Sequence, residues 1–363
     1  MPSKINKCFY TNLTFEKMLL AHNRSRKNKM YRTEVIKFEL NLESNIINLV
    51  DDIKNNKYKI GQYREFWILD PKERLIKALP YRDRIVHQWY VEEFIKPYIV
   101  PKFIHTTFAC LKDKGTHNAV EQTQKYMRTC QRQNKDFWIL KCDIKKFFYN
   151  IDKDILFNIL SKYMRDNDLI AFTHNLIFDS DSKVGIPIGN YTSQYFANIY
   201  MNELDQYIKR VLKLKYYVRY MDDFVIMLNS KEECKYYKKV IEDFLHTNLK
   251  LELNEKSRYY PSAMGVNFCG YRIFTTHILL RTSSKKKIKQ KVKKWNKRWR
   301  NKTLNIDNTI QSLNSWLGHA SHCNSYHLQQ KILNKCDFLI NDKFYENREK
   351  ELIELIENDK EKK

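Results

Sequence analysis

The sequence of 363 residues is poor in the residues that interrupt regular structure, with only seven Gly and seven Pro. This scarcity favours long helices and strands joined by few flexible linkers. No run approaches the roughly 18 uninterrupted apolar residues that a membrane-spanning helix needs. The first residues also lack the apolar core of a secretory signal. The sequence therefore predicts a cytoplasmic chain without membrane segments.

Paired cysteine motifs are absent as well, because the eight Cys are scattered and form no C-x-x-C pair. This excludes a disulfide frame or a zinc ribbon and is typical of reduced thiols. Acidic residues are few: 42 Asp and Glu stand against 66 Lys and Arg, a formal net charge of +24. Such an excess favours a polyanionic partner through phosphate contacts and counterion release. The alternative is a genome that raises Lys content in every protein.

Apolar residues are abundant enough to exclude a disordered chain, at 43% hydrophobic and 14% aromatic. The length fits about two to three domains or subdomains. Apolar runs predict strands at Phe66–Leu69, Arg74–Ala78, Trp138–Asp143, Tyr216–Tyr220 and Phe224–Leu228, with Asp70-Pro71 as the first turn. Helical spacing predicts helices after the capping residues Asp152 and Thr192 and over residues 231–248. This order of elements predicts an α+β fold with a central antiparallel hairpin.

Two acidic positions stand out because each lies at the end of an apolar strand. Asp143 ends the strand that begins at Trp138, and Asp222 with Asp223 occupies the tip of the predicted hairpin. A carboxylate in such a place is costly to bury unless it is paired or holds a cation. Oxygen ligands from adjacent strands suit Mg²⁺, and two such ions can stabilise the attacking and leaving oxygens of phosphoryl transfer. The alternative is that Asp222 and Asp223 are ordinary polar turn residues.

The residues around these carboxylates resemble the sequence boxes of reverse transcriptases, in the order in which that family has them. Tyr220 through Asp223 resembles the Tyr-X-Asp-Asp box, and Asp143 through Phe148 resembles motif A. The further matching segments are Arg74–Ile76 with Tyr81–Arg84 (fingers), Thr107–His117 (the segment before motif A), Leu253–Lys256 (motif D) and Phe268, Cys269, Gly270 and Tyr271 (the motif E primer grip).

The resemblance implies a right-hand polymerase with fingers, a palm made of an antiparallel sheet with helices, and a basic helical thumb. Residues 1–50 would be an N-terminal helical segment, 51–264 the fingers and palm, 265–345 the thumb and 346–363 a charged tail. It also implies RNA-directed DNA synthesis with two Mg²⁺ ions, or Mn²⁺ as a substitute. Template RNA, a DNA primer or cDNA, and deoxynucleoside triphosphates would be the partners.

The same resemblance assigns the metal ligands. Asp143 and Asp222 would hold the ions, and Asp223 would be a supporting ligand or would orient the others. The backbone carbonyl of Ile144 would complete the shell of one ion.

The loop Ile188–Gln194 distinguishes branches of the family. Most reverse transcriptases have Gln-Gly-x-x-x-Ser-Pro at this place, whereas the Ile-Gly-Asn-Tyr-Thr-Ser-Gln found here resembles the enzymes of diversity-generating retroelements, in prokaryotic cells or phages. This implies cDNA synthesis that is error-prone at template adenines (mutagenic retrohoming) and a small basic helical accessory protein. A defence-associated, anti-phage reverse transcriptase is the alternative. A catalytically silent RNA-binding scaffold is a third hypothesis, which the complete set of carboxylates disfavours.

The resemblance also assigns contacts to the incoming nucleotide. Ile188 replaces a Gln that can hydrogen-bond the nucleotide sugar, so correct and incorrect pairs should differ less in transition-state binding; a packed loop residue is the alternative. Gly189 fits a close backbone approach to the nucleotide. The remaining candidates are Lys72 and Arg74 for the triphosphate, with Lys77 in place of Lys72 as an alternative, Phe148 as the ring that excludes a ribose 2′-OH, and Lys256 near the leaving pyrophosphate. Spacing alone leaves open whether Phe147 or Phe148 points into the site.

Residues 281–300 contain eleven Lys and Arg and no acidic residue. Ile288, Val292, Trp295 and Trp299 are spaced by 4, 3 and 4, which is one stripe of an amphipathic helix. The charged face predicts nucleic acid contacts by Lys285, Lys286, Lys287, Lys289, Lys291, Lys293 and Lys294. The alternatives are a helix on a membrane surface and a helix that binds a protein partner.

Histidines offer one further metal hypothesis. His319, His322 and Cys323 have near-ligand spacing for zinc, but no second pair accompanies them. The more conservative interpretation treats His residues such as His87, His105 and His117 as structural or as contacts to the backbone.

Overall fold

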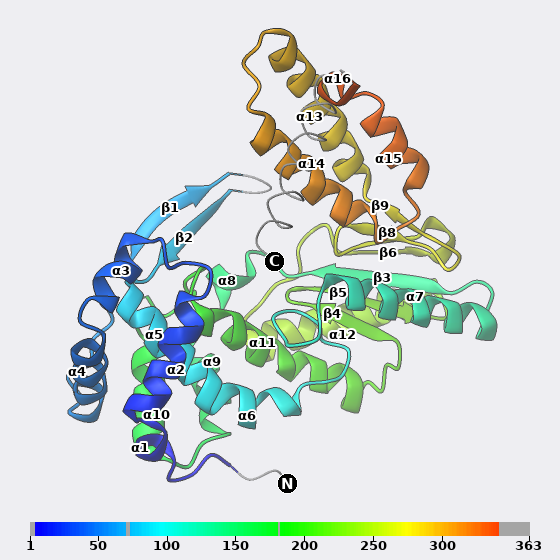
Figure 1. The fold of residues 1–363 in the computed structure, drawn as a ribbon. Helices are drawn as coiled ribbons and strands as arrows, with labels where there is room; N and C mark the ends of the chain where they lie inside the picture. The colour runs from blue at the N-terminus through cyan, green and yellow to red at the C-terminus, as the bar shows by residue number, and fades with distance from the viewer. Residues whose placement is uncertain (1–3, 70–72, 181, 341–363) are drawn as a thin grey trace, which may run out of the picture. The chain divides into compact units, whose positions relative to one another are not determined.

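The computed structural model describes residues 4–69, 73–180 and 182–340 (Figure 1). The described residues divide into two compact units. Unit 1 takes in those within 1–122 and 136–260, and unit 2 those within 123–135 and 261–340. In these ranges no helix has the length and apolar character needed to cross a membrane. The predicted Asp70-Pro71 turn and the tail 346–363 lie outside the described residues.

Unit 1 has the mixed α and β content that the sequence predicts. Its helices are α1 (Phe9–Asn12), α2 (Phe15–Arg26), α3 (Thr33–Glu39), α4 (Leu42–Lys54), α5 (Tyr81–Tyr90), α6 (Lys96–Tyr98), α8 (Phe147–Asn150), α9 (Lys153–Ser161), α10 (Asn167–Ile177), α11 (Tyr191–Gln206) and α12 (Lys231–Leu249). Single π-helical turns follow α5 (Val91–Ile95) and α11 (Tyr207–Val211), and a 3-10 turn spans Val100–Lys102. Its strands are β1 (Arg64–Ile68), β2 (Arg74–Ala78), β3 (Trp138–Asp143), β4 (Tyr217–Tyr220), β5 (Asp223–Leu228) and β6 (Arg258–Pro261).

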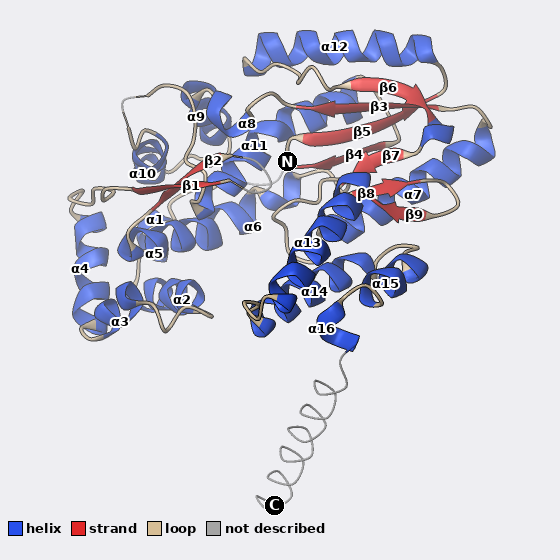
Figure 2. Cartoon of the chain, turned by 90° about the horizontal axis from the view of Figure 1, so that it is seen from above, coloured by secondary structure: helices blue, strands red, loops and turns tan. Residues whose placement is uncertain are grey.

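A four-stranded sheet in the order β4-β5-β3-β6 forms the centre of unit 1. Strands β3 and β5 run antiparallel, from Trp138 opposite Leu228 to Asp143 opposite Asp223. Strand β4 pairs antiparallel with the other edge of β5, so the predicted hairpin is confirmed. Figure 2 shows α12 running along this sheet, and α12 contacts both β3 and β5.

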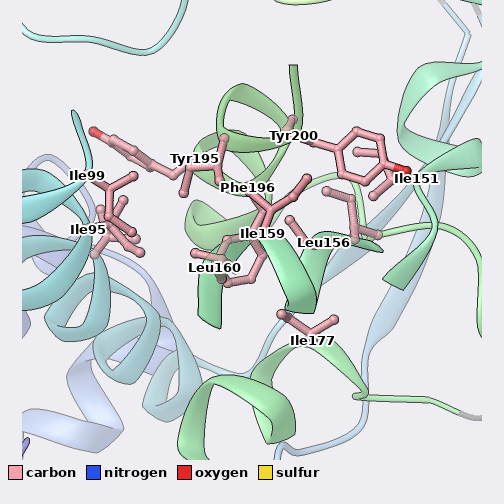
Figure 3. Packing of buried hydrophobic residues seen from close by; sticks show 14 of the residues in the cluster. Ile95, Ile99, Ile151, Leu156, Ile159, Leu160, Ile177, Tyr195, Phe196 and Tyr200 are labelled. Carbon is pink, nitrogen blue, oxygen red and sulfur yellow. The ribbon is translucent and has the colours of Figure 1, made fainter. Parts of the chain in front are cut away.

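The helices of unit 1 share one large core. Asp152 caps α9 as predicted, because its Oδ1 accepts a hydrogen bond from the Ile155 N–H at 2.9 Å. The predicted cap at Thr192 is wrong: α11 follows Asn190, and Thr192 lies inside the helix. Figure 3 shows part of the core, where Ile95, Ile99, Ile151, Leu156, Ile159, Leu160, Ile177, Tyr195, Phe196 and Tyr200 pack together.

Strands β1 and β2 form a separate two-stranded antiparallel sheet. The first strand is shifted from the predicted Phe66–Leu69 to Arg64–Ile68, and all five of its residues are exposed. The second strand, Arg74–Ala78, is as predicted and is half-buried after its first residue.

Unit 2 combines a small sheet with helices. Helix α7 (Thr116–Gln133) begins in unit 1 and ends in unit 2. The other elements are a 3-10 turn (Ser262–Met264), β7 (Val266–Phe268), β8 (Tyr271–Ile273), β9 (Ile278–Leu280), α13 (Thr282–Arg300), α14 (Ile306–Ala320), α15 (Tyr326–Leu333) and α16 (Asp337–Ile340). The predicted basic helix is therefore confirmed as α13. Its apolar stripe forms a core of its own, where Ile288, Val292 and Trp295 pack with Leu313 and Ile332.

Candidate active site

Three aspartates lie at the same end of the two central strands, β3 and β5. Asp143 is the last residue of β3 and lies directly opposite Asp223, the first residue of β5. Asp222 occupies the turn between β4 and β5, and its backbone carbonyl accepts a hydrogen bond from the Ile144 N–H at 3.3 Å. The strand pairing therefore brings together carboxylates that lie about eighty positions apart in the sequence, as the register of an antiparallel pair requires.

The surroundings of Asp223 shift the pKa of its carboxylate. Partial burial raises its pKa to about 6, and the nearby charges of Asp143 and Asp222 act in the same direction. The Lys141 ammonium, 2.8 Å from Asp223 Oδ1, opposes this rise. The like charges of Asp143 and Asp222 thus disfavour the ionised form of Asp223, and a bound cation would offset this repulsion.

The donor set suits a hard divalent cation that also binds phosphate oxygens. Within residues 4–69, 73–180 and 182–340, no group of three or more His, Cys, Asp or Glu side chains is placed so that it could hold a metal ion by itself. An open set fits Mg²⁺, which takes one or two carboxylates and completes its shell with water and substrate phosphates. Asp143 and Asp222 can supply those carboxylates, while one oxygen of Asp223 is already engaged by Lys141. The residues present therefore fit the ion that the sequence predicts.

The end of β3 is held by the segment that the sequence assigned to motif D. The Asn254 N–H donates to the Asp143 carbonyl at 2.7 Å, and the Asp143 N–H donates to Ser257 Oγ at 3.1 Å. Ile144 forms an isolated bridge with Leu253, and the bonds of that bridge use the residues on either side of Ile144. The Ile144 carbonyl therefore takes no part in the two hydrogen bonds of this bridge. Lys256, three residues after Leu253, is exposed.

The structure distinguishes the two adjacent phenylalanines of motif A. Phe147 is only 2% exposed and belongs to the core of unit 1. Phe148 is half-buried, and its backbone carbonyl accepts a hydrogen bond from the Ile186 N–H at 2.9 Å. Phe148 is thus the more accessible residue of the pair, and its contact with the nucleotide sugar stays a prediction.

The loop before α11 lies against strand β2. The Lys77 N–H donates to the Ile188 carbonyl at 3.0 Å. Gly189 has φ +131°, and a Cβ added there would lie 2.8 Å from the Lys77 carbonyl oxygen. The close backbone approach expected at Gly189 is therefore made by β2 in this structure, and this contact alone explains the glycine.

A pocket of about 160 Å³ lies beside this loop, and its walls include Leu75, Lys77, Tyr149, Pro187 and Ile188. The Lys77 ammonium is 3.0 Å from Glu65 across the hairpin. Arg74 is exposed at the start of β2, whereas Lys72 lies outside the described residues. The half-buried Ile188 side chain therefore faces a small, mainly apolar space.

Sequence reasoning missed a buried polar network behind the loop. Asn190 Nδ2 donates to the Tyr63 hydroxyl at 2.8 Å, and this hydroxyl donates to Asp179 Oδ2 at 2.6 Å. Lys153 Nζ lies 2.9 Å from the other oxygen of Asp179, and both side chains of this ion pair are nearly inaccessible. Burial and the Asp179 charge raise the pKa of Tyr63, so its hydroxyl stays a donor. The sequence signal is weak, because Tyr63 and Asp179 are far apart and each resembles a surface residue.

Of the histidines interpreted as structural, His87 is the most buried. Its Nδ1 shares a hydrogen bond of 2.7 Å with Thr192 Oγ1. Burial lowers its pKa to about 4, which keeps the ring neutral. His105 is exposed, and its backbone carbonyl accepts a hydrogen bond from Lys114 Nζ.

In unit 2 the predicted primer grip is the tight turn between β7 and β8. Cys269 and Gly270 both have positive φ, +47° and +88°. The Tyr271 hydroxyl donates to the His319 carbonyl at 2.8 Å and contacts His319 Nδ1 at 2.9 Å. A non-glycine residue such as Cys269 is strained at positive φ, and such strain clusters at functional sites.

The zinc hypothesis for residues 319–323 finds no support in the geometry. His319 bonds Tyr271, and the Cys323 thiol donates to the Ala320 carbonyl. Across the described part of the chain, no group of His, Cys, Asp and Glu forms a metal-binding cluster.

Helix α13 presents one apolar and one basic face. Lys286, Lys287, Lys289, Lys291, Lys293 and Lys294 are exposed, and Lys285 is half-buried. A cationic groove of about 380 Å³ lies further along the helix, and its lining residues are Lys293, Asn296, Lys297, Arg300 and Asn301. The basic surface therefore continues past the lysines singled out from sequence.

Comparison with known proteins identifies relatives across most of the chain. The profile of the family described as "Reverse transcriptase (RNA-dependent DNA polymerase)" matches residues 69–273. The group II intron-encoded protein LtrA of Lactococcus lactis is 21% identical over 322 residues, covering 68% of this chain and 52% of that protein. A COX1/OXI3 intron 2 protein of Saccharomyces cerevisiae is 24% identical over 223 residues, covering 44% of this chain and 25% of that protein. The chain thus spans a quarter to a half of the length of these curated relatives.

Solved structures that match part of this chain include telomerases of two Candida species. Apo telomerase of Candida tropicalis, truncated from its C-terminal domain, has a TM-score of 0.46 at 13% identity, covering 63% of this chain and 58% of that one. Telomerase of Candida albicans with a fragment of telomeric RNA has a TM-score of 0.47 at 11% identity, covering 66% and 49%.

Proposed function

Because this chain belongs to the reverse transcriptase (RNA-dependent DNA polymerase) family, we propose that it is an RNA-directed DNA polymerase that extends a DNA primer on template RNA. The observation that carries the proposal is the pairing of Asp143 directly opposite Asp223, with Asp222 in the adjoining turn. Bound Mg²⁺, in two ions or with Mn²⁺ as a substitute, would supply the charge that stabilises the attacking and leaving oxygens.

The residues of the chain have distinct parts in this proposal. Asp143 and Asp222 hold the ions, assisted by the Ile144 carbonyl, and Lys141 keeps the Asp223 carboxylate oriented. Phe148 excludes a ribose 2′-OH, because it is the accessible ring of its pair. The cations assigned to the triphosphate and the leaving pyrophosphate are Arg74, Lys256 and either Lys72 or Lys77, and the residues assigned to primer and template are Phe268–Tyr271 and the lysines of α13.

Primer extension with Asp222→Asn tests the proposal. Losing this carboxylate should abolish extension on an RNA template with Mg²⁺ and leave template affinity nearly unchanged, because affinity depends mostly on phosphate contacts. Asp243→Asn makes the same chemical change at an exposed position of α12 and should retain full activity. Undiminished extension by Asp222→Asn would refute this catalytic centre.

We further propose that the enzyme belongs to a diversity-generating retroelement and makes cDNA with errors at template adenines. The support is the Ile-Gly-Asn-x-Thr-Ser-Gln loop together with the apolar surroundings of Ile188. An apolar side chain cannot supply the hydrogen bond that a Gln could make to a correctly seated nucleotide. A small basic helical accessory protein is part of this proposal on the resemblance alone.

The test of this finer function is Ile188→Gln. The variant should lower misincorporation opposite template adenine more than opposite the other bases, and about 1.4 kcal/mol of added discrimination would change the error ratio tenfold. Val184→Gln is the matched control, because it adds the same amide to the same pocket outside the motif. Sequencing of the cDNA gives the answer. Rare adenine errors in the wild type would favour the defence-associated function instead.

A further inference from the structure

Arg219, two residues before Met221, is the most completely buried charge beside the catalytic turn. Its Nε and Nη2 donate to the two carboxylate oxygens of Asp205 at 2.7 and 2.6 Å. Both side chains are 0% exposed, and the Tyr217 hydroxyl donates to the same carboxylate at 2.6 Å. Such a bidentate pair has a fixed geometry that a Lys in place of the Arg could not reproduce.

The remaining nitrogen of the guanidinium reaches the turn itself. Arg219 Nη1 donates to the Met221 carbonyl at 2.8 Å and to Asn198 Oδ1 at 3.1 Å. Met221 has φ +58°, a conformation that is strained for any residue with a Cβ, and it directly precedes Asp222 and Asp223. The bond from Arg219 therefore fixes the backbone at the point where the two carboxylates are set.

The backbone of Arg219 is also fixed, on the outer edge of β4. The Arg219 N–H donates to the Thr106 carbonyl at 3.0 Å, and the Phe108 N–H donates to the Arg219 carbonyl at 3.1 Å. Asn198 Nδ2 donates to the Ala109 carbonyl at 2.9 Å, so the segment after Thr106 is tied to α11 as well. Arg219 is thus anchored both by its backbone and by the bonds of its guanidinium to Asp205, and this fixes the nitrogen that bonds the Met221 carbonyl.

We propose that Asp205 and Arg219 are positioning residues, which hold the Met221 turn so that Asp222 and Asp223 can bind a divalent cation. A buried ion pair is weak evidence for stability, because apolar residues of similar size often serve as well. The bond to the turn carbonyl is what an apolar pair could not provide. Asp205 also lies near the end of α11, whose first turn contains residues 191–194 of the Ile188–Gln194 segment. One helix therefore carries part of that segment and also supports the turn at Met221.

The test is cation binding, with Mn²⁺ as the probe and water-proton relaxation as the measurement. The signal of interest is the part that Asp222→Asn abolishes. Arg219→Lys keeps the charge opposite Asp205 but cannot serve Asp205, Asn198 and Met221 together, so Mn²⁺ affinity should fall at least tenfold. Tyr217→Phe is the control: it removes one hydrogen bond from Asp205 and leaves the bond to Met221, so thermal stability should fall while Mn²⁺ affinity stays within twofold of wild type.

A second variant covers the case in which Arg219→Lys does not fold. In Asp205→Asn with Arg219→Met no uncompensated charge is left buried, so the fold should survive while the donor to Met221 is lost. Wild-type Mn²⁺ affinity in this variant or in folded Arg219→Lys would overturn the proposal. An equal loss in Tyr217→Phe would also overturn it, because general loosening would then explain the effect.

The catalytic consequence rests on the proposed polymerase function, but the cation measurement does not. If Arg219→Lys weakens Mn²⁺ binding and the wild type extends no primer, the positioning role stands and the polymerase proposal fails. If the wild type extends primers and Arg219→Lys binds Mn²⁺ normally, the positioning role fails and the polymerase proposal stands. Where both hold, the Mg²⁺ concentration for half-maximal extension should rise about as much as the Mn²⁺ dissociation constant.

Discussion

At the scale of single residues, Gly189 has a structural reason that differs from the expected contact with the nucleotide, and that contact stays a prediction. The sequence indicated a close backbone approach there, and the structure supplies one from the Lys77 carbonyl. Sequence patterns cannot name this partner, because Lys77 and Gly189 lie on elements that are far apart in the chain. The glycine is needed for the packing of β2 whether or not a nucleotide also comes close.

Gly189→Ala should destabilise the protein. The added Cβ would meet the Lys77 carbonyl at 2.8 Å, and φ +131° is strained for Ala, so we expect a loss of about 1–3 kcal/mol in the free energy of unfolding. Denaturant titration measures this. Gly318→Ala is the control, since no atom lies within 4 Å of its added Cβ in α14, and it should be neutral or stabilise by about 0.5–1 kcal/mol.

The buried His87 should make the free energy of unfolding depend on pH in the acidic range. Burial lowers its pKa from 6.5 to about 4, so between these values the unfolded chain binds a proton that the folded protein does not. Its stabilising effect is therefore complete above pH 6.5 and is lost as the pH falls to 4, by about 3 kcal/mol in all.

The measurement is the free energy of unfolding at pH 7.5 and 4.5 in wild type and His87→Phe. The variant starts less stable, because it loses the bond to Thr192, but its further loss on acidification should be smaller by about 2–3 kcal/mol. His246→Gln, on α12, should keep the wild-type dependence. Parallel acid profiles of wild type and His87→Phe would contradict the prediction.

The positions of the three aspartates in the sheet could be predicted from sequence, because Asp143 ends an apolar strand and Asp222 and Asp223 lie between two others, so local pattern and chain order were sufficient. The network of Tyr63, Asp179 and Lys153 could not be placed in this way. Polar residues that are buried in pairs look like surface residues in a sequence, and only long-range packing shows that Lys153 is 1% exposed.

At the scale of elements, apolar periodicity identified the strands and the amphipathic helices correctly. The capping residues predicted for the helix ends were less reliable. Asp152 caps α9 as expected, but Thr192 does not cap α11. The hydroxyl of Thr192 is instead hydrogen-bonded to His87 on a different helix, so a tertiary contact uses the side chain that was expected to cap α11.

The basic face of α13 should govern the salt dependence of nucleic acid binding. Changing Lys286, Lys289 and Lys293 to Gln removes three exposed charges from one side of the helix. Each lost phosphate contact should reduce the slope of log K against log salt by about one unit or slightly less. Affinity for an RNA–DNA hybrid, measured across a salt series, tests this.

The matched control removes the same charge from α12, by changing the exposed residues Lys231, Lys235 and Lys239 to Gln. These changes should leave the slope nearly unaltered. If both triple variants flatten the slope equally, net charge and not the α13 face determines the affinity. If neither does, α13 binds something other than nucleic acid.

At the scale of the whole molecule, the composition and the order of the sequence motifs were sufficient to predict the fold class and the family. No sequence pattern indicated that residues 123–135 belong to the same compact unit as residues 261–340. That association depends on long-range bonds from α7 to the loop after β8. Gln124 Nε2 donates to the Phe274 carbonyl at 2.9 Å, and Arg128 Nε donates to the Thr275 carbonyl at 2.8 Å. Local sequence patterns cannot predict hydrogen bonds between residues that lie about 150 positions apart in the chain.

Separate cores predict separate unfolding. The large core of unit 1 and the core formed by α13, α14 and α15 share no buried residue, so calorimetry should show two transitions. A buried Leu→Ala change costs about 2–5 kcal/mol within its own core. Leu156→Ala, at a residue 0% exposed, should lower the transition of unit 1, and Leu313→Ala, at a residue 3% exposed, that of unit 2. The two variants carry the same chemical change and control each other. A single transition that both lower equally would mean that the units unfold as one body.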